Sequence, residues 1–215
     1  MNFKVKPVIG MAIALSAFAV AQSPLPELSI EPVGGGSIFI IKNTAPLPVS
    51  AYYIELVGYP GSSYVLIQDD VASPIPPGTE KRLRTESMTA GAAPTYMKLL
   101  AALFVDGSSS GAPDKISQII EHRRMMLKAT REAIQRLDKA KSAGKPALIA
   151  DLKQWEASIP EPVRKYRYRA AEINQADTKS FIIGIEKKVE TGSVDSALTE
   201  LHASEKAMAA SKPAL

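Results

Sequence analysis

The composition of the chain changes abruptly near residue 112, and this change constrains the fold more than any motif does. Before it, from Leu25 to Gly111, short runs of Val, Ile and Tyr alternate with Gly, Pro and Ser, which is typical of strands joined by tight turns. After it, from Pro113 onward, the chain is rich in Ala, Lys, Glu, Arg and Leu and has few helix breakers. We therefore expect an α+β protein in two parts, a strand-built domain at 22–111 and a helical region at 112–215.

The first residues have the features of a secretory leader. Lys4 and Lys6 precede an almost wholly apolar stretch, and Ala19-Val20-Ala21 offers the small-x-small pattern that a signal peptidase needs. We expect residues 1–21 to be a cleaved signal peptide and the mature protein to be periplasmic or extracellular. An uncleaved membrane anchor is the alternative, but the apolar stretch is shorter than the roughly 20 residues that cross a bilayer. No later stretch predicts a transmembrane segment in the mature chain.

The residue counts limit how the mature chain can be stabilised. None of the 215 residues is cysteine, so the fold has no disulfide and must be stabilised by its hydrophobic core. The formal net charge is +4, and loss of Lys4 and Lys6 with the leader leaves the mature chain nearly neutral. The excess of basic residues that remains lies in the helical region.

The strand pattern predicts an antiparallel β-sandwich. Side chains at 52, 54 and 56 alternate with those at 53, 55 and 57, as expected when one face of a strand meets a core. No helical crossover interrupts the strands, so we expect an immunoglobulin-like sandwich. It is an atypical one, because the cysteine pair is absent and the only tryptophan, Trp155, lies outside it. The strands are expected at 27–32, 36–43, 51–58, 62–68, 79–84 and 96–105, the last with both faces covered.

The helical region opens with a clear start signal. Pro113 suits the first helical turn, and Asp114 places a negative charge at the positive end of the helix dipole. An apolar stripe then predicts one long helix that ends before Gly144 and Pro146. Shorter amphipathic helices follow, with an Ala-rich tail that frays after about Ala203. Their narrow apolar stripes predict a small bundle or hairpin packed on itself, on the sandwich or on a partner.

Two short patterns are compatible with a nucleophilic serine. Gly107–Gly111 has the G-x-S-x-G spacing of a hydrolase elbow around Ser109, with His122 or His202 as its possible base. That elbow belongs to a helix-flanked parallel sheet, whereas only strands and turns precede Ser109, so a polar turn between the two parts explains it better. Ser142 and Lys145 fit S-x-x-K, but they lie where the long helix ends, and helix termination explains them better. We therefore predict that the protein is not an enzyme.

Metal and cofactor sites are not predicted either. The two histidines are far apart in the sequence, and the first has only Glu121 beside it, which is too few ligands for zinc. Asp69 and Asp70 form an isolated acidic pair, and such pairs in loops are usually solvated. The sequence has no calcium-loop pattern and no glycine-rich phosphate loop, so we expect no cofactor.

Basic residues of the helical region form the candidate interaction surface. They could pair with acidic groups of a partner protein, of an envelope polymer or of anionic lipid headgroups. The alternative is an ordinary solvated helix face, because acidic residues such as Glu121, Glu132 and Asp138 are interspersed. Export makes nucleic acid an unsuitable partner. The candidate residues are Arg123, Arg124, Lys128, Arg131, Arg164, Lys165, Arg167, Tyr168 and Arg169.

Several turn and strand signatures give the first part a resemblance to known proteins. They are Asn43 followed by the segment 48–52, the turn at 75–78, and the segment 103–108 that leads into a charged helix. Residues from about 28 to 137 resemble a group of exported bacterial proteins of uncharacterised role that have a single immunoglobulin-like sandwich. The resemblance implies the fold and the destination, and it carries over no catalytic residue.

These observations favour an exported, non-catalytic protein in which the sandwich is a structural or protein-binding module and the helices present an interaction surface. The expected partner is a protein or a cell-envelope component. A peripheral membrane-surface protein that uses its basic helices is the second hypothesis, and a serine hydrolase at Ser109 is the third.

Overall fold

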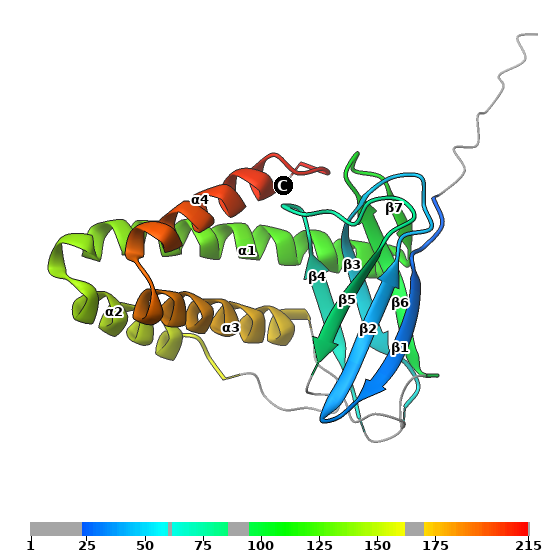
Figure 1. Cartoon of the computed structure of the whole chain (residues 1–215), viewed down its shortest axis with the longest axis horizontal. Helices are drawn as coiled ribbons and strands as arrows, with labels where there is room; N and C mark the ends of the chain where they lie inside the picture. Colours follow the sequence, from blue (N-terminus) through cyan, green and yellow to red (C-terminus); the bar gives the residue numbers. More distant parts are fainter. Residues whose placement is uncertain (1–22, 60–61, 86–94, 162–169, 215) are drawn as a thin grey trace, which may run out of the picture.

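The computed structural model describes residues 23–59, 62–85, 95–161 and 170–214, and it contains two antiparallel sheets followed by helices (Figure 1). The last strand ends at Gly111 and the first helix begins at Pro113, where the composition changes. The predicted α+β class, strands first and helices second, is confirmed.

Within the described ranges, the strands form one sheet of three and one of four. The first has the order β1 (Glu27–Val33), β2 (Gly36–Lys42) and β5 (Glu80–Thr85), and the second has the order β4 (Val65–Asp69), β3 (Val49–Leu56), β6 (Met97–Phe104) and β7 (Ser109–Gly111). Every pairing is antiparallel. Strand β7 was not predicted, because three small residues carry no apolar alternation and are recognisable as a strand only by their pairing with β6.

Two glycines are needed for the way these strands turn and pair. Gly35, with φ +79°, completes the tight turn between β1 and β2, where Val33 pairs with Gly36. Gly111, with φ +101°, ends β7 so close to β6 that a Cβ atom would lie 2.1 Å from the carbonyl oxygen of Leu100. No larger residue fits there without moving the backbone of β6.

The core of the sandwich lies between the two sheets. Phe39 and Ile41 from β2 face Tyr52 and Ile54 from β3, and all four are fully buried. The other face of the larger sheet is also covered, because Tyr53 and its neighbours pack against the helical region. The predicted coverage of both faces of β6 is confirmed, since Phe104 belongs to the first cluster and Leu103 to the second.

The helices form a layer beside the larger sheet and extend away from it (Figure 1). They are α1 (Pro113–Ala140), a 3₁₀ turn at Lys141–Ala143, α2 (Lys145–Ser158), α3 (Ala170–Thr191) and α4 (Val194–Ala209). The first half of α1 packs on the sheet through Ile116 and Ile119, and its second half joins the helical core through Ala133 and Leu137. This one helix therefore belongs to two of the three hydrophobic clusters, the one on the outer face of the larger sheet and the one among the helices.

Helix α4 extends farther than its sequence predicted. Fraying was expected after about Ala203, yet the helix continues to Ala209. Leu201 and Met208 are both buried, so tertiary packing adds to the helix propensity of the Ala, Glu, Lys and Met residues in the last turns. None of the helices in the described ranges has an apolar stretch long enough to cross a membrane.

Candidate functional site

The segment around Ser109 forms a β-hairpin. Ser109 and Ser110 lie in β7, antiparallel to β6, and the carbonyl oxygen of Ser108 accepts a hydrogen bond from the Phe104 amide at 3.0 Å. The elbow pattern requires the serine at the sharp turn between a parallel strand and a helix. The local structure therefore differs from the one that the hydrolase hypothesis needs.

The other candidate groups for chemistry have structural partners. His122 Nε2 lies 3.0 Å from Asp177 Oδ2, which joins α1 to α3. Lys145 Nζ donates to the carbonyl oxygen of Glu190 at 2.7 Å, so it caps the end of α3 and does not activate Ser142. Within the described ranges, no three His, Cys, Asp or Glu side chains gather as a metal site would require.

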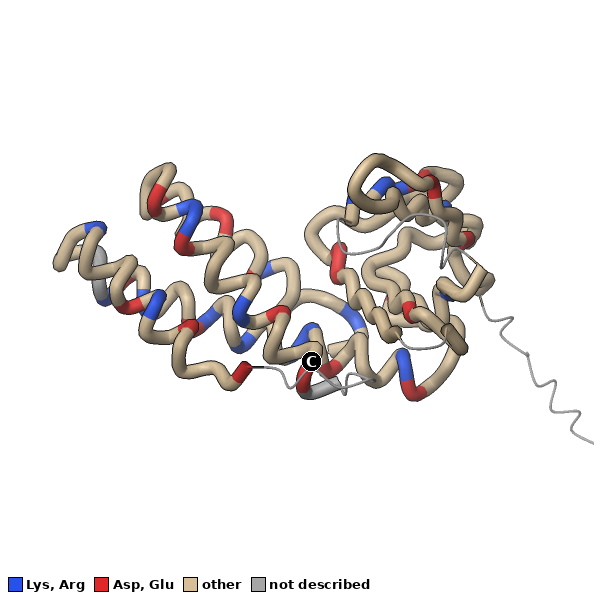
Figure 2. Tube along the Cα trace, turned by 90° about the horizontal axis from the view of Figure 1, so that it is seen from below, with Lys and Arg blue, Asp and Glu red and all other residues tan. Residues whose placement is uncertain are grey.

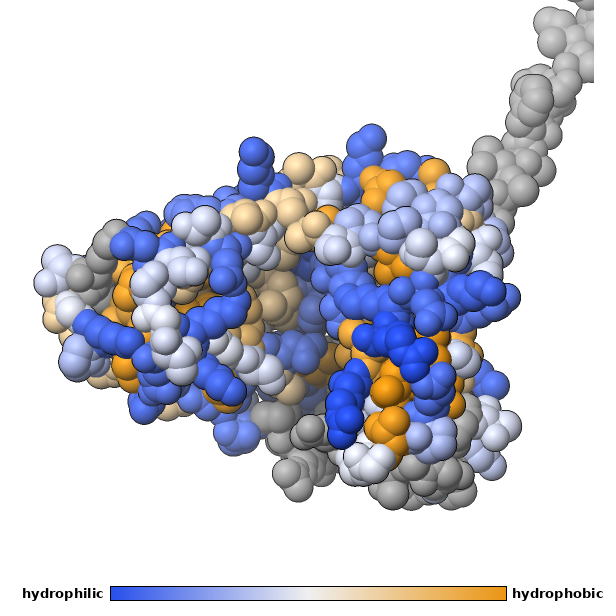
Figure 3. Space-filling model, viewed as in Figure 1, coloured by the Kyte–Doolittle hydropathy of each residue, from blue (hydrophilic) through white to orange (hydrophobic). Residues whose placement is uncertain are grey.

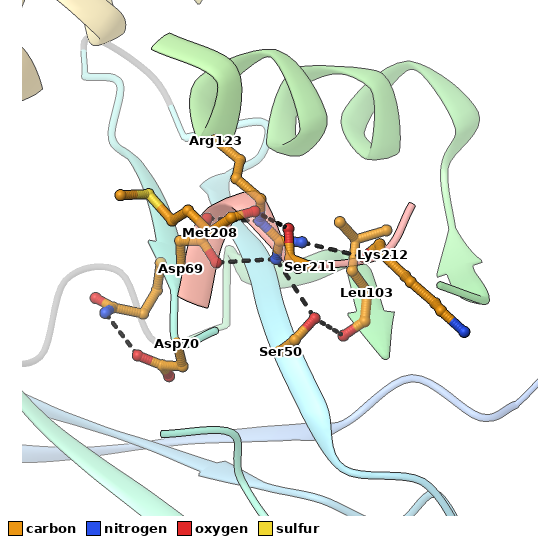
Figure 4. A network of polar contacts seen from close by, with 9 residues as sticks. Ser50, Asp69, Asp70, Leu103, Arg123, Met208, Ser211 and Lys212 are labelled. Atoms are coloured by element: carbon orange, nitrogen blue, oxygen red, sulfur yellow. Dashed lines mark hydrogen bonds and ion pairs between the residues drawn. The ribbon is translucent and has the colours of Figure 1, made fainter. Parts of the chain in front are cut away.

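A buried arginine joins the helices to the sheet (Figure 4). Arg123 of α1 is 0% exposed, and its guanidinium forms a bidentate pair with Asp69 at the end of β4, with Nε–Oδ2 and Nη2–Oδ1 distances of 2.7 and 2.9 Å. Its Nη1 donates to the carbonyl oxygen of Lys212 at 3.1 Å, and Nη2 also lies 3.4 Å from Ser50 Oγ. We call these four residues the Arg123 centre.

The Arg123 centre brings together distant parts of the chain. Ser50 comes from β3 and donates in turn to the carbonyl oxygen of Leu103 in β6. Lys212 belongs to the tail after α4, where its Cβ atom lies so near Gly107 that a Cβ at that glycine would approach it to 2.9 Å. The single guanidinium thus fixes the sheet, the long helix and the tail in one arrangement.

Asp70, the other half of the acidic pair, faces the sandwich core. Its carboxylate accepts a hydrogen bond from Gln68 at 2.8 Å and pairs with Lys81 of β5, which links the two sheets. Tyr52 is fully buried nearby, and its hydroxyl has no hydrogen-bond partner in the described structure. Burial, together with the negative charge of Asp70, raises the pKa of Tyr52 far above its ordinary value. The sequence predicts that this acidic pair is solvated. In the structure, each of the two carboxylates instead has a structural partner of its own.

The exposed side of α1 carries a groove of about 330 Å³, which we call the α1 groove. Three of the predicted basic residues, Arg124, Lys128 and Arg131, lie along it one helical turn apart. The groove is also lined by Leu127, Glu132 and Gln135. The structure therefore gathers these three cations on one face, as their spacing predicts.

The cations of the α1 groove are only partly neutralised. Arg131 Nε lies 2.9 Å from Glu205 of α4, whereas Arg124 is 3.5 Å from Glu121. Lys128 is exposed and forms no ion pair with any other described residue. Acidic residues alternate with basic ones along the rest of the helices (Figure 2). The centre of the α1 groove is thus a place where an added carboxylate or phosphate would find a cation.

The other interaction-surface candidates predicted from the sequence do not line the α1 groove. One of them lies inside the molecule, and the rest lie outside the residues that the structure describes. Arg123 was expected on the interaction surface, but it lies inside the molecule. A signal for this was present, because Arg123 stands where the apolar stripe of Ile119 and Leu127 calls for a buried side chain. The candidates outside the described residues are Arg164, Lys165, Arg167, Tyr168 and Arg169.

Comparison with known proteins identifies no family for this chain. No family model matches the sequence, and neither a curated protein nor a solved structure shows significant similarity to it.

Proposed function

We propose that the chain is an exported, non-catalytic binding protein, in which an immunoglobulin-like sandwich carries a helical surface that binds acidic segments of a partner protein. The observation that carries the proposal is the α1 groove, where Arg124, Lys128 and Arg131 lie side by side. Its chemistry suits carboxylates, because guanidinium and ammonium groups form charge-assisted hydrogen bonds with them.

The attachment of α1 supports this role. The helix is held at the sheet by Arg123 and along its second half by the helical core, so its exposed face is rigid before any partner arrives. A preorganised surface loses less conformational entropy on binding than a mobile one does. The Gln135 side chain adds an amide beside the cations, and the buried Leu127 forms part of the groove floor.

The same groove chemistry would attract anionic lipid headgroups, so the experiment must separate a protein partner from a membrane. The chain without its first 21 residues is incubated with cell-envelope proteins and, separately, with vesicles that contain phosphatidylglycerol. We expect a cross-linked protein partner whose capture falls with added salt, because exposed charges are screened. Capture by the vesicles alone would replace the proposal with a membrane-surface function.

A matched pair of variants shows whether the α1 groove is responsible. The groove variant combines Arg124→Glu, Lys128→Glu and Arg131→Glu. The control variant makes an equal number of charge reversals on exposed lysines outside the groove, at Lys98, Lys139 and Lys206. We expect the groove variant to lose the partner and the control to retain it. Equal capture by both variants would refute the proposal.

A further inference from the structure

A second groove, of about 310 Å³, lies between α3 and α4, and we call it the hairpin groove. Figure 1 shows the two helices diverging from the turn that joins them. Apolar side chains line the groove, and Figure 3 shows hydrophobic surface among hydrophilic side chains at the helical end of the molecule. They come from both helices and are Phe181, Ile185, Ala197 and Leu201.

The surface of α3 beside the hairpin groove is shaped for close contact with another helix. Gly184 lies on the groove in the middle of α3, where a glycine costs about 1 kcal/mol relative to alanine. A Cβ atom there would meet nothing within 4 Å, so packing inside the molecule does not require this glycine. The hairpin groove is therefore open at Gly184, where a side chain of another helix fits.

The two rims of the hairpin groove carry opposite charges. Lys188 stands on the α3 rim and Glu200 on the α4 rim, and the two form an ion pair across the groove. Their side chains are 58% and 55% exposed, so both remain open to a further charged group. A partner that fits needs an anion over the α3 rim and a cation over the α4 rim.

A second copy of the same hairpin meets this requirement. Rotation by 180° about an axis that runs along the groove places the α3 of one copy over the α4 of the other. Lys188 of each copy then lies over Glu200 of the other, and the two apolar linings face each other. The four helices have the arrangement of a four-helix bundle, in which small residues let helices approach closely.

We propose that the hairpin groove is closed by a second copy of this chain, in a two-fold dimer of α3–α4 hairpins. The contact shares no lining residue with the α1 groove, so it goes beyond the proposed binding function and does not depend on it.

Sedimentation velocity on the chain without its first 21 residues tests this dimer directly. We expect a monomer–dimer equilibrium with Kd of about 10 µM, measured from about 1 to about 100 µM protein. Gly184→Glu places a charge inside the contact and should shift the equilibrium to monomer, whereas Gly184→Ala adds a single methyl group and should weaken the dimer much less. Both substitutions raise helix propensity, so neither should lower the thermal midpoint. Wild-type protein that stays monomeric over the whole range overturns the proposal.

Charge reversal on the rims tests the predicted pairing between copies. Lys188→Glu gives a molecule with two anionic rims, and Glu200→Lys gives one with two cationic rims. Each variant alone should dimerise at least about ten-fold more weakly, because the two-fold axis places every like-charge contact in the dimer twice. An equimolar mixture should dimerise again, as a heterodimer. If the single variants associate like the wild type, or if their mixture remains monomeric, this face is not the contact.

Discussion

Replacement of Arg123 by methionine is expected to destabilise the protein severely while leaving its shape nearly unchanged. Methionine fills much of the space of the arginine stem, but it leaves the Asp69 carboxylate, only 11% exposed, without its bidentate partner. Removal of one partner of a buried ion pair costs about 3–5 kcal/mol. Because Asp69 keeps a little contact with water, we expect a loss of about 3 kcal/mol from the free energy of unfolding.

A double-mutant cycle separates the ion pair from simple loss of packing. Asp69→Leu alone should cost about 4 kcal/mol, since it leaves the fully buried Arg123 guanidinium without its anion. The double variant Arg123→Met, Asp69→Leu has no unpaired charge and should lie only about 2 kcal/mol below the wild type, because Ser50 and the Lys212 carbonyl still lose a donor. The coupling free energy between the two sites is then about 5 kcal/mol.

Urea denaturation with two probes measures these values. The fluorescence of Trp155, the only tryptophan, reports on the helical region, and near-ultraviolet circular dichroism of the buried tyrosines reports on the sandwich. If the Arg123 centre joins the two parts, both transitions shift together. The control is Arg124→Met, whose exposed contact to Glu121 is worth less than about 0.5 kcal/mol. A loss below about 1 kcal/mol for Arg123→Met, or a coupling near zero, would refute the reasoning.

Three further predictions follow from the buried core and the backbone. Because burial raises the pKa of Tyr52 above the ordinary value of 10.0, its proton is held more tightly in the folded state, and stability should fall as the pH rises above about 10. Tyr52→Phe should reduce that loss in alkaline urea titrations without lowering stability at neutral pH; equal alkaline slopes would contradict this. Deletion of residues 211–215 removes the carbonyl acceptor from Arg123 Nη1 and should cost about 1–3 kcal/mol in urea, with no effect expected once Arg123 is already methionine. Gly111→Ala should cost at least about 3 kcal/mol or prevent folding, whereas Gly34→Ala, with open space around it, should change the thermal midpoint little.

Periodicity and turn chemistry made much of the fold predictable from the sequence. The break at residue 112, the strands around Tyr52 and the start of the long helix at Pro113 all follow from local residue patterns. Strand β7 was missed because its pairing with β6 is a long-range contact. The last turns of α4 were missed although their residues favour a helix, because the sequence does not show that Met208 is buried. Local patterns contain no information about such partners.

The candidate site was predictable only in part, for a related reason. The i, i+4, i+7 spacing of Arg124, Lys128 and Arg131 places them on one helix face whatever the helix packs against. The burial of Arg123 depends on Asp69, which is far away in the sequence and which looked like one half of a solvated acidic pair. The hairpin groove likewise depends on how α3 and α4 diverge, and this angle is set by the rest of the helical core.

The hydrogen bond between Arg123 and the carbonyl oxygen of Lys212 is the last contact of the Arg123 centre that can form as the chain is synthesised. Residues 50, 69 and 123 are all synthesised well before residue 212, so the sandwich and the first turns of α1 can associate while one guanidinium nitrogen still lacks its protein acceptor. Only when synthesis has passed Lys212 can that last hydrogen bond form. A chain that ends before this position lacks that hydrogen bond and has a weaker joint between its two halves.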